Sequence, residues 1–373
     1  MAWPAGVHSA AISQARPRLL SNVVLRQDHS ATGGIHPYHA AIWHGSNVPQ
    51  AVGQALQIAA GPSHGWGASS ILMPTKYMDG QSLSPKDIDA IAVTRGPGMM
   101  ASLSNGMVAA KTLASVWNKP LIYVHHMAAH ALTPFFTEES PPAFPFLTLL
   151  VSGGHTMLVL AESVQKYQIL ATTSDDSIGD AFDKAARDMG IPWGGNTAHS
   201  NPGAALEAFA AAADITTVQE LKEHLRKQKN IALPSAMRGQ LAFSYSGLKA
   251  TVTRAVQALP SDVKTRRALA HLFQEAAVAQ ISEKLRLVLQ RTLDLPIKDV
   301  VCSGGVASNS FLRQHLRDTL DAAGKEGTRL LFPPLEFCTD NAAMIAHTGL
   351  LFYEQRTHDL SIQPVAKWNL EDL

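Results

Sequence analysis

Apolar runs that end in a glycine turn and lead into a helical segment recur along this chain of 373 residues. Ala90 to Thr94 runs into Gly96-Pro97-Gly98 and then into a helical segment of small residues that reaches about Trp117. Asp299 to Cys302 runs into Ser303-Gly304-Gly305 and a second helical segment. Alternation of strand and helix is typical of layered α/β proteins, so we predict an α/β fold.

Further elements are predicted around these two patterns. Phe146 to Val151 and Met157 to Ala161 are apolar runs on either side of Ser152-Gly153-Gly154-His155, which indicates a hairpin with a glycine-rich tip. A second unit is expected to begin near Phe146. The other predicted strands cover residues 19–25, 120–124 and 329–332. The other predicted helices cover residues 126–130, 180–189, 204–212, 267–293 and 311–322, with a last one from Asp340 to about Tyr353.

Composition limits the classes to which the chain can belong. A hydrophobic content of 46% is that of a globular protein, and a net charge of +1 gives no global attraction to nucleic acid. Two cysteines are too few for a disulfide framework. No apolar run approaches the ~18 residues of a membrane span, so we expect a soluble protein without a membrane partner. The start of the chain carries Arg16, Arg18 and Arg26 and no acid before Asp28, which resembles an organellar transit peptide.

Two histidines one helical turn apart, His126 and His130, form the first candidate site. On a helix, positions i and i+4 lie on one face about 5–6 Å apart, so both imidazoles can reach one ion. Asp340, far downstream, is the carboxylate expected to complete the site. Two imidazoles and one carboxylate suit zinc or ferrous iron and leave positions open for a substrate oxygen.

Each of these groups also has an explanation without metal. An aspartate at a helix start, where Asp340 is predicted to lie, caps exposed backbone N–H groups. The neighbouring His125 is interpreted as a structural residue or as support for the ligands. The zinc peptidase pattern places Glu directly after its first histidine, whereas this chain has Met127 there, which argues against peptidase chemistry.

The two glycine-rich loops are candidate phosphate sites. Ser152-Gly153-Gly154-His155 and Ser303-Gly304-Gly305-Val306 each follow a strand, where backbone N–H groups can approach phosphate oxygens. Ser308 and Asn309, after the second loop, are placed to bond a ribose or base. Ordinary tight turns remain an alternative for either loop, and neither loop has the sequence of a nucleoside triphosphatase P-loop.

Acidic residues near residue 180 have mixed explanations. Asp176, Asp180 and Asp183 lie at a predicted helix start, where acids interact favourably with the helix dipole. An i,i+4 pair with Lys184 accounts for Asp180. Asp183, next to Phe182, is harder to explain as a solvated surface residue.

Together these motifs resemble one family, the tRNA adenosine threonylcarbamoyltransferases, and its bacterial and mitochondrial branch in particular. The similarity runs from about Leu19 to the C-terminus. It rests on ordered motifs at residues 96–98, 126–130, 150–156, 179–184, 243–249, 303–309 and 337–341.

The resemblance implies a fold and a domain division. The fold is the actin-like ATPase fold, with two lobes around a nucleotide cleft. Residues 1–145 and 350–373 would form the N-terminal lobe, and residues 146–349 the C-terminal lobe, with a basic helical insert at about 203–292. Nothing in Met1 to Asn22 matches the first strand with which family members open, so that strand is expected to be missing.

The resemblance also implies an activity. The threonylcarbamoyl group would pass from threonylcarbamoyl-AMP to N6 of adenosine 37 in tRNAs that read ANN codons, which yields N6-threonylcarbamoyladenosine and AMP. The implied partners are tRNA, a separate synthase that supplies threonylcarbamoyl-AMP, and a second copy of the chain in a homodimer. The implied location is mitochondrial.

Carried over residue by residue, the resemblance implies a set of site residues. One divalent metal ion per subunit, zinc or iron, would be held by His126, His130 and Asp340. Substrate would be bound by Leu150, Val151, Ser152, Gly153, Gly154, His155, Asp183, Gly195, Ser308, Asn309 and Thr339. No catalytic residue is separable from these two sets.

Two other functions are alternatives. A family member without its first strand could act as a tRNA- or nucleotide-binding or assembly partner with weakened turnover. A metallopeptidase is disfavoured by Met127.

The segment from Lys222 to Arg267 contains ten Lys or Arg residues and only two acids, Glu223 and Asp262. A solvated helix face explains such a segment as readily as RNA binding. The RNA interpretation predicts phosphate contacts from Lys227, Lys229, Arg266 and Arg267.

Overall fold

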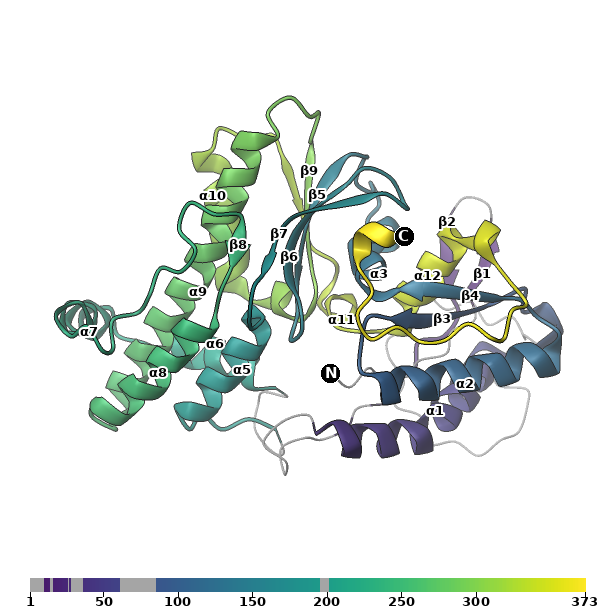
Figure 1. Cartoon of the computed structure of the whole chain (residues 1–373), viewed down its shortest axis with the longest axis horizontal. Helices are drawn as coiled ribbons and strands as arrows, with labels where there is room; N and C mark the ends of the chain where they lie inside the picture. The colour runs from purple at the N-terminus through teal and green to yellow at the C-terminus, as the bar shows by residue number, and fades with distance from the viewer. Residues whose placement is uncertain (1–9, 14–15, 26, 28–35, 61–84, 195–200) are drawn as a thin grey trace. The chain divides into compact units, whose positions relative to one another are not determined.

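The computed structural model describes residues 10–13, 16–25, 27, 36–60, 85–194 and 201–373. They form two compact units, each described by itself below (Figure 1). The first unit comprises Met1–Pro141 and Pro333–Leu373, and the second comprises Pro142–Phe332. Residues 333–349, which include Asp340, therefore group with the first unit and with the two histidines.

The first unit is built on two parallel strands, β3 (Ile91–Gly96) and β4 (Leu121–His125), joined by helix α2 (Met100–Trp117). This is the strand, glycine turn and helix that the sequence predicts. Ile91, Ala110, Ala114 and Leu121 form a buried cluster that fixes α2 against the strands. Both strands end at the same edge, because the carboxyl ends of parallel strands coincide.

Five more α-helices accompany this pair of strands in the described part of the first unit. They are α1 (Pro37–Ala60), α3 (His126–Leu132), α4 (Pro134–Thr137) and α12 (Ala342–Leu351), and a short helix α11 (Leu335–Cys338) precedes α12. A hairpin of β1 (Ala10–Ser13) and β2 (Arg16–Leu19) precedes α1. The predicted strand over residues 19–25 is wrong, because only Leu19 belongs to a strand there.

The second unit is built on a mixed six-stranded sheet of order β10-β9-β5-β6-β7-β8. Strands β5, β9 and β10 run parallel, β5-β6-β7 is an antiparallel meander, and β8 runs parallel to β7. Their bounds are β5 (Phe146–Val151), β6 (Thr156–Ala161), β7 (Tyr167–Thr173), β8 (Ala242–Phe243), β9 (Asp299–Ser303) and β10 (Arg329–Leu331). Every residue of β5, β6 and β9 is buried, as expected for strands covered on both faces.

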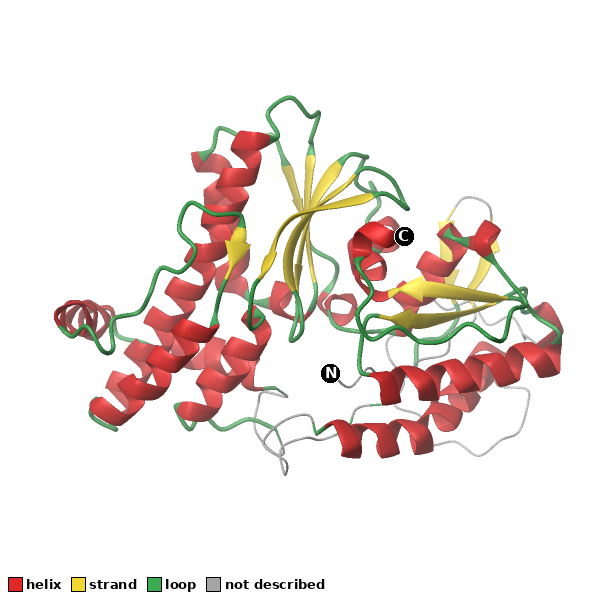
Figure 2. Ribbon diagram, in the orientation of Figure 1, coloured by secondary structure: helices red, strands yellow, loops and turns green. Residues whose placement is uncertain are grey.

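In the described part of the second unit six α-helices accompany this sheet, and Figure 2 shows them grouped beside its strands. They are α5 (Ile178–Asp188), α6 (Pro202–Ala211), α7 (Ile215–Lys227), α8 (Ser246–Ala258), α9 (Val263–Arg291) and α10 (Ser310–Ala322). The longest, α9, buries fourteen of its residues, so it is the central helix of the group rather than an exposed basic arm. Among the described residues, no helix is both long and apolar enough to cross a membrane.

Candidate metal centre and glycine-loop site

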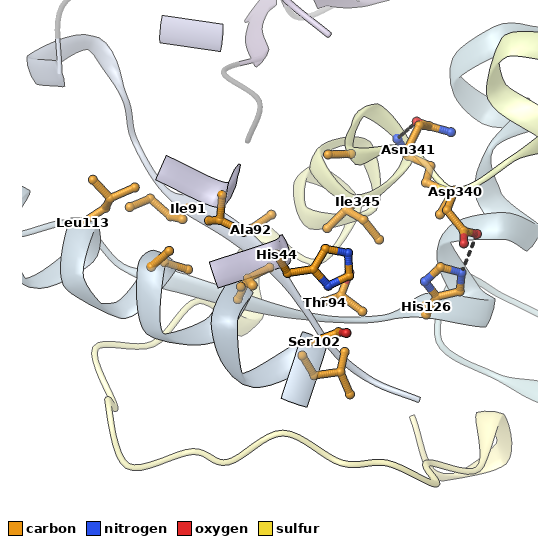
Figure 3. Close-up of a pocket in the computed structure, with 18 of the residues that line it drawn as sticks. His44, Ile91, Ala92, Thr94, Ser102, Leu113, His126, Asp340, Asn341 and Ile345 are labelled. Carbon is orange, nitrogen blue, oxygen red and sulfur yellow. Dashed lines mark hydrogen bonds and ion pairs between the residues drawn. The ribbon is translucent and has the colours of Figure 1, made fainter. Parts of the chain in front are cut away.

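The paired histidines and the distant aspartate meet in the first unit. Nε2 of His130 lies 2.9 Å and Nε2 of His126 lies 3.3 Å from Oδ1 of Asp340. The two imidazole rings have centroids 4.6 Å apart, and both are 1% exposed. Figure 3 shows the Asp340 carboxylate directed at the His126 ring.

Donor type and spacing both fit a metal ion. One ligand atom from each of His126, His130 and Asp340 lies within 4.8 Å of the other two. Two ligands bound at about 2.0–2.2 Å in a tetrahedral site lie about 3.3–3.5 Å apart, so the observed separations need only small adjustments. Burial of the Asp340 carboxyl disfavours its charge, but the two imidazoles beside it hold its pKa below the ordinary value. An ionised carboxylate facing two imidazoles is a ligand set for zinc or ferrous iron.

His125 positions the helix that carries the two histidines. It is fully buried, and its Nδ1 accepts hydrogen bonds from the backbone N–H groups of Met127 at 3.1 Å and Ala128 at 3.4 Å. Its Nε2 lies 3.1 Å from the carbonyl oxygen of Trp368, whose ring packs on it at 4.8 Å. His125 is therefore the N-cap of α3, which agrees with its interpretation as a structural residue.

The expected N-cap role of Asp340 is wrong. The cap of α12 is Asn341, whose Oδ1 accepts the N–H of Met344 at 2.9 Å. Asn341 Nδ2 also donates to the carbonyl oxygen of Thr339 at 2.9 Å. Because the neighbouring residue satisfies the helix start, the Asp340 carboxylate is left to the histidines.

In the second unit the predicted glycine-rich tip forms between β5 and β6. Ser152 organises it: its N–H donates to the His155 carbonyl at 2.8 Å, and its Oγ accepts the N–H of Gly154 at 3.3 Å and of His155 at 3.1 Å. Leu150 and Val151 are the last residues of β5 and are buried. The loop is thus a defined turn at the carboxyl end of a central strand.

The second glycine loop lies against the first. Leu150 of β5 pairs with Ser303 of β9, and Gly304 follows at a φ of 105°. A Cβ at Gly304 would lie 2.3 Å from the carbonyl oxygen of Val151, so only glycine fits there. Gly179, at the start of α5, is equally tight, since a Cβ there would lie 2.6 Å from the Ser152 carbonyl oxygen. Three glycine-containing segments therefore converge at one edge of the sheet.

The other predicted substrate residues lie in different parts of the chain. Ser308 and Asn309 are in the second unit, where Ser308 Oγ donates to the Gly305 carbonyl at 2.7 Å. Asn309 caps α10 through its Oδ1, and its Nδ2 donates to Gln274 Oε1 at 3.0 Å. Thr339 is in the first unit beside Asp340 and is exposed. Gly195 lies outside the described residues.

Asp183 is the most perturbed carboxyl of this region. Burial raises its pKa to about 6, against the opposing effect of the Arg187 charge. Its neighbour Asp180 pairs with Lys184 at 2.7 Å, as the i,i+4 spacing predicts. A buried carboxyl with a strongly raised pKa is a candidate for a functional role.

Two sets of contacts around the glycine loops were not predicted from sequence. Asp175 accepts hydrogen bonds from Ser244 Oγ and Ser246 Oγ at 2.6 Å and from the Tyr245 N–H at 2.8 Å, which ties residues 243–249 to the end of β7. Ser177 caps α5 and donates to the Gly153 carbonyl at 2.7 Å. The pattern Ser177-x-x-Asp180 is the signal that would have identified this cap.

Several basic side chains between Lys222 and Arg267 already make contacts inside the second unit. Lys222 pairs with Glu275 at 2.6 Å, Arg266 donates to the Met189 carbonyl at 3.2 Å, and Arg267 lies over the ring of Phe209. Lys227 and Lys229 are exposed. Of the four predicted phosphate contacts, these two lysines are the most accessible.

Comparison with solved structures gives only distant likeness. A crystal structure of T. kodakarensis HypF has a TM-score of 0.47 at 14% identity, with 74% of this chain and 42% of that chain covered. A crystal structure of full-length HypF in the phosphate- and nucleotide-bound form has a TM-score of 0.46 at 12% identity, with 71% and 39% covered. This chain thus spans less than half of either.

Comparison of sequences is far more specific. The chain is 37% identical over 351 residues to the mitochondrial tRNA N6-adenosine threonylcarbamoyltransferase of Schizosaccharomyces pombe, with 92% of this chain and 77% of that protein covered. The family model described as tRNA N6-adenosine threonylcarbamoyltransferase matches residues 70–347, a span that contains both histidines, Asp340 and both glycine loops. The chain therefore belongs to the tRNA N6-adenosine threonylcarbamoyltransferase family.

Proposed function

We propose that this protein transfers the threonylcarbamoyl group of threonylcarbamoyl-AMP to N6 of adenosine 37 in tRNAs that read ANN codons. The products are N6-threonylcarbamoyladenosine and AMP. The observation that carries the proposal is the meeting of His126, His130 and Asp340 in a chain that belongs to this family. The mitochondrial location expected from the sequence agrees with the mitochondrial relative.

One divalent ion, zinc or ferrous iron, is the proposed cofactor, held by His126, His130 and Asp340. When bound, such an ion supplies a Lewis acid for a carbonyl or carboxylate oxygen. The protein's own part is to hold the ligands: His125 fixes the start of α3, and Asn341 leaves the Asp340 carboxylate available. Little reorganisation is then needed when the ion binds.

The glycine-loop site of the second unit is the proposed adenylate site. We propose that Leu150 to His155 contact the phosphate and acyl group. We propose that Asp183, Gly195, Ser308 and Asn309 hold the nucleoside, and that Thr339 also binds substrate. The close approach of Gly304 to Val151 and of Gly179 to Ser152 supports this. It brings backbone groups of three segments together at the end of β5, with no side chain of the two glycines in the way.

A mixed anhydride of an acid and a phosphate already carries its activation. The protein therefore needs to orient the acyl group and the adenine amine and to exclude water. The proposed partners are tRNA, a separate synthase that makes the unstable adenylate, and a second copy of the chain. We also propose that the two units are the lobes of the actin-like ATPase fold.

The decisive experiment combines purified full-length protein, threonylcarbamoyl-AMP and a tRNA that lacks the modification. We expect N6-threonylcarbamoyladenosine and AMP in equal amounts, measured by nucleoside mass spectrometry and chromatography. A His126→Ala variant serves as the inactive control. The proposal would be overturned if the protein bound tRNA and threonylcarbamoyl-AMP but formed no product with any of the metal ions tested.

A further inference from the structure

Helix α5 packs with its first turn directly on the glycine loop of residues 152–155. A Cβ at Gly179, in that first turn, would lie 2.6 Å from the Ser152 carbonyl oxygen and 2.7 Å from the backbone nitrogen of Gly153. The backbone of the helix therefore lies against the backbone of the loop at this point. The contacts that join the two decide how precisely the loop is placed on the helix.

Ser177, the residue before α5, joins the helix to the loop through one hydroxyl. Its Oγ accepts the N–H of Asp180 at 3.2 Å, which makes Ser177 the N-cap of α5. The same Oγ donates its proton to the Gly153 carbonyl at 2.7 Å. Ser177 is 4% exposed, so water competes poorly for either hydrogen bond. One hydroxyl thus fixes the start of the helix and the direction of a loop peptide together.

The peptide group between Gly153 and Gly154 is held at both of its polar atoms. Its carbonyl accepts the Ser177 hydroxyl, and its N–H donates to Ser152 Oγ at 3.3 Å. A pair of glycines has wide conformational freedom, so these two hydrogen bonds restrict a peptide that would otherwise rotate readily. Gly153 itself is exposed. The loop therefore presents a fixed backbone to solvent while Ser177 holds it from the buried side.

A second hydrogen bond supports the same junction. The N–H of Ile178, the first residue of α5, donates to Thr156 Oγ1 at 2.8 Å. Thr156 begins β6, directly after the glycine loop, and both Ile178 and Thr156 are 0% exposed. The junction between loop and helix is therefore part of the core of the second unit rather than a surface turn.

Asp183 lies on the same helix, six residues after Ser177. At about 1.5 Å per residue, the two positions are about 9 Å apart along the helix axis. The backbone of Gly203, near the start of α6, hydrogen-bonds the Asp183 carboxylate. Phe182 is 3% exposed and packs on Phe273 of α9, with ring centroids 5.2 Å apart, which holds α5 against sliding. The glycine loop and Asp183 are therefore kept at a fixed separation.

We propose that Ser177 is a positioning residue for the adenylate, because it sets the distance between the loop that contacts the phosphate and the carboxylate that holds the nucleoside. The inference rests on the proposed function of this site, in which residues 150–155 contact the phosphate and acyl group and Asp183 holds the nucleoside. Helix α5 is then the spacer between the two ends of one bound nucleotide. Ser177 acts through Gly153 and does not touch the substrate.

This role has a consequence for ligands that carry only part of the adenylate. AMP has both a phosphate and a nucleoside, so its binding depends on the spacing that Ser177 sets. Adenosine lacks the phosphate, so its binding depends on Asp183 but not on the glycine loop. Ser177 should therefore contribute to the preference for AMP over adenosine, whereas a general loss of structure would weaken both ligands alike.

The test measures the affinity of the full-length protein for AMP and for adenosine by isothermal calorimetry. Ser177→Gly removes the hydroxyl, but glycine is well accepted at an N-cap position, so α5 should still form. We expect the ratio of AMP affinity to adenosine affinity to fall by about three- to tenfold, the net worth of one hydrogen bond. The affinity for adenosine should stay as in the wild type.

Two further variants complete the test. Asp214→Gly is the matched control, because Asp214 caps another helix of the same unit, α7, and accepts the Thr217 N–H at 2.9 Å. It removes an N-cap without a change in the glycine loop, so it should keep the wild-type ratio. Ser177→Thr retains a hydroxyl at the junction and should also keep most of the ratio.

Failure of this inference can be distinguished from failure of the proposed function. If the wild type binds neither AMP nor adenosine, the proposed adenylate site is wrong and the role of Ser177 is overturned with it. If the wild type prefers AMP and Ser177→Gly keeps that preference, or loses affinity for both ligands equally, only the role of Ser177 is overturned. Equal losses of the ratio in Ser177→Gly and Ser177→Thr would overturn it as well, since the hydroxyl would then have no part in the preference.

Discussion

Nε2 of His130 lies 2.9 Å from Oδ1 of Asp340, although 210 residues separate the two in sequence. The contact exists because α3 begins where β4 ends and because α12 packs against both β3 and α3. A parallel strand pair thus supplies the edge at which the ligands gather. The packing of α3 and α12 brings the three donors together, so the arrangement of the candidate ligands follows from the fold.

Replacement of His130 by alanine should remove one of the three protein ligands. We expect metal affinity to fall by more than the 10–100-fold typical for loss of a residue that merely supports a ligand, and transfer activity to fall with it. Metal content after dialysis and a competition titration with a chromophoric chelator measure the effect. His358→Ala, at an exposed position, is the control and should keep full metal content.

Replacement of Asn341 by alanine tests whether the cap of α12 at Asn341 keeps the Asp340 carboxylate available for a metal ion. The variant loses the Oδ1 acceptor for the Met344 N–H and should lose about 1 kcal/mol of unfolding free energy. Asp340 then becomes the nearest carboxylate for the exposed helix start, so metal affinity should also fall. Asn341→Asp retains a cap and should restore stability. Equal metal affinity in all three proteins would show that Asn341 has no influence on Asp340.

His347 should make the protein sensitive to acid. It is 6% exposed, neither ring nitrogen has a partner among the described residues, and burial lowers its pKa to about 4. The unfolded chain, with an ordinary pKa near 6.5, binds the proton first, so stability is complete above about pH 6.5 and declines as pH falls towards 4. The loss should reach about 3 kcal/mol.

His347→Phe tests this, because a phenyl ring keeps the contact with Phe136 and cannot be protonated. Its unfolding free energy, measured by urea titration between about pH 7 and about pH 4.5, should decline less than that of the wild type. The exposed His358→Gln variant should follow the wild type. Parallel pH profiles for wild type and His347→Phe would contradict the prediction.

Asp183 should have the opposite dependence on pH. Its folded pKa of about 6 lies above the ordinary value, so the folded state retains the proton longer than the unfolded state. Stability from this group is full below about pH 3.8 and is lost as pH rises through about 6. Asp183→Asn should therefore raise the unfolding free energy at about pH 7.5 by about 1–2 kcal/mol, with allowance for partial exposure. If Asp183 holds the nucleoside, the same variant should bind threonylcarbamoyl-AMP less well.

Lys227 and Lys229 should contribute to tRNA binding if the basic segment is an RNA surface. Reversal of both charges to glutamate should weaken binding at low salt and reduce the slope of log affinity against log salt by about 2, since each lysine would neutralise one phosphate. Lys222→Glu is less informative, because Lys222 already pairs with Glu275. The control is Lys166→Glu, an exposed lysine between β6 and β7. An unchanged salt slope would show that the two lysines are solvated surface residues without phosphate contacts.

The sequence predicted those parts of the fold that depend on local pattern. The strands β3, β4, β5, β6 and β9 and the helices that follow glycine turns were found, because apolar runs and turn residues are local signals. The prediction for residues 19–25 failed for the opposite reason. Its apolar residues pack against helices, with Val23 on α1 and Leu19 beside Phe337, and only Leu19, which pairs with Ala10 of β1, belongs to a strand.

The candidate metal ligands and a structural role for His125 were predicted from the sequence, but the cap of α12 was not. The i,i+4 spacing revealed His126 and His130, whereas the cap was assigned to Asp340 and belongs to Asn341. Two consecutive residues with good capping side chains cannot be ranked without the backbone conformation. The role of Trp368 depends on a contact across 243 residues, which no local pattern reveals.

The C-terminal segment limits where a purification tag can be attached. The carbonyl of Trp368 lies against His125, the N–H of Val365 donates to the carbonyl oxygen of Arg95, and Leu370 is 2% exposed. An affinity tag fused directly after Leu373 would therefore begin close to the buried Leu370 and to the contact between Trp368 and His125, which caps α3. A long, uncharged spacer, or removal of the tag before metal loading, would keep the tag from altering the measured metal affinity.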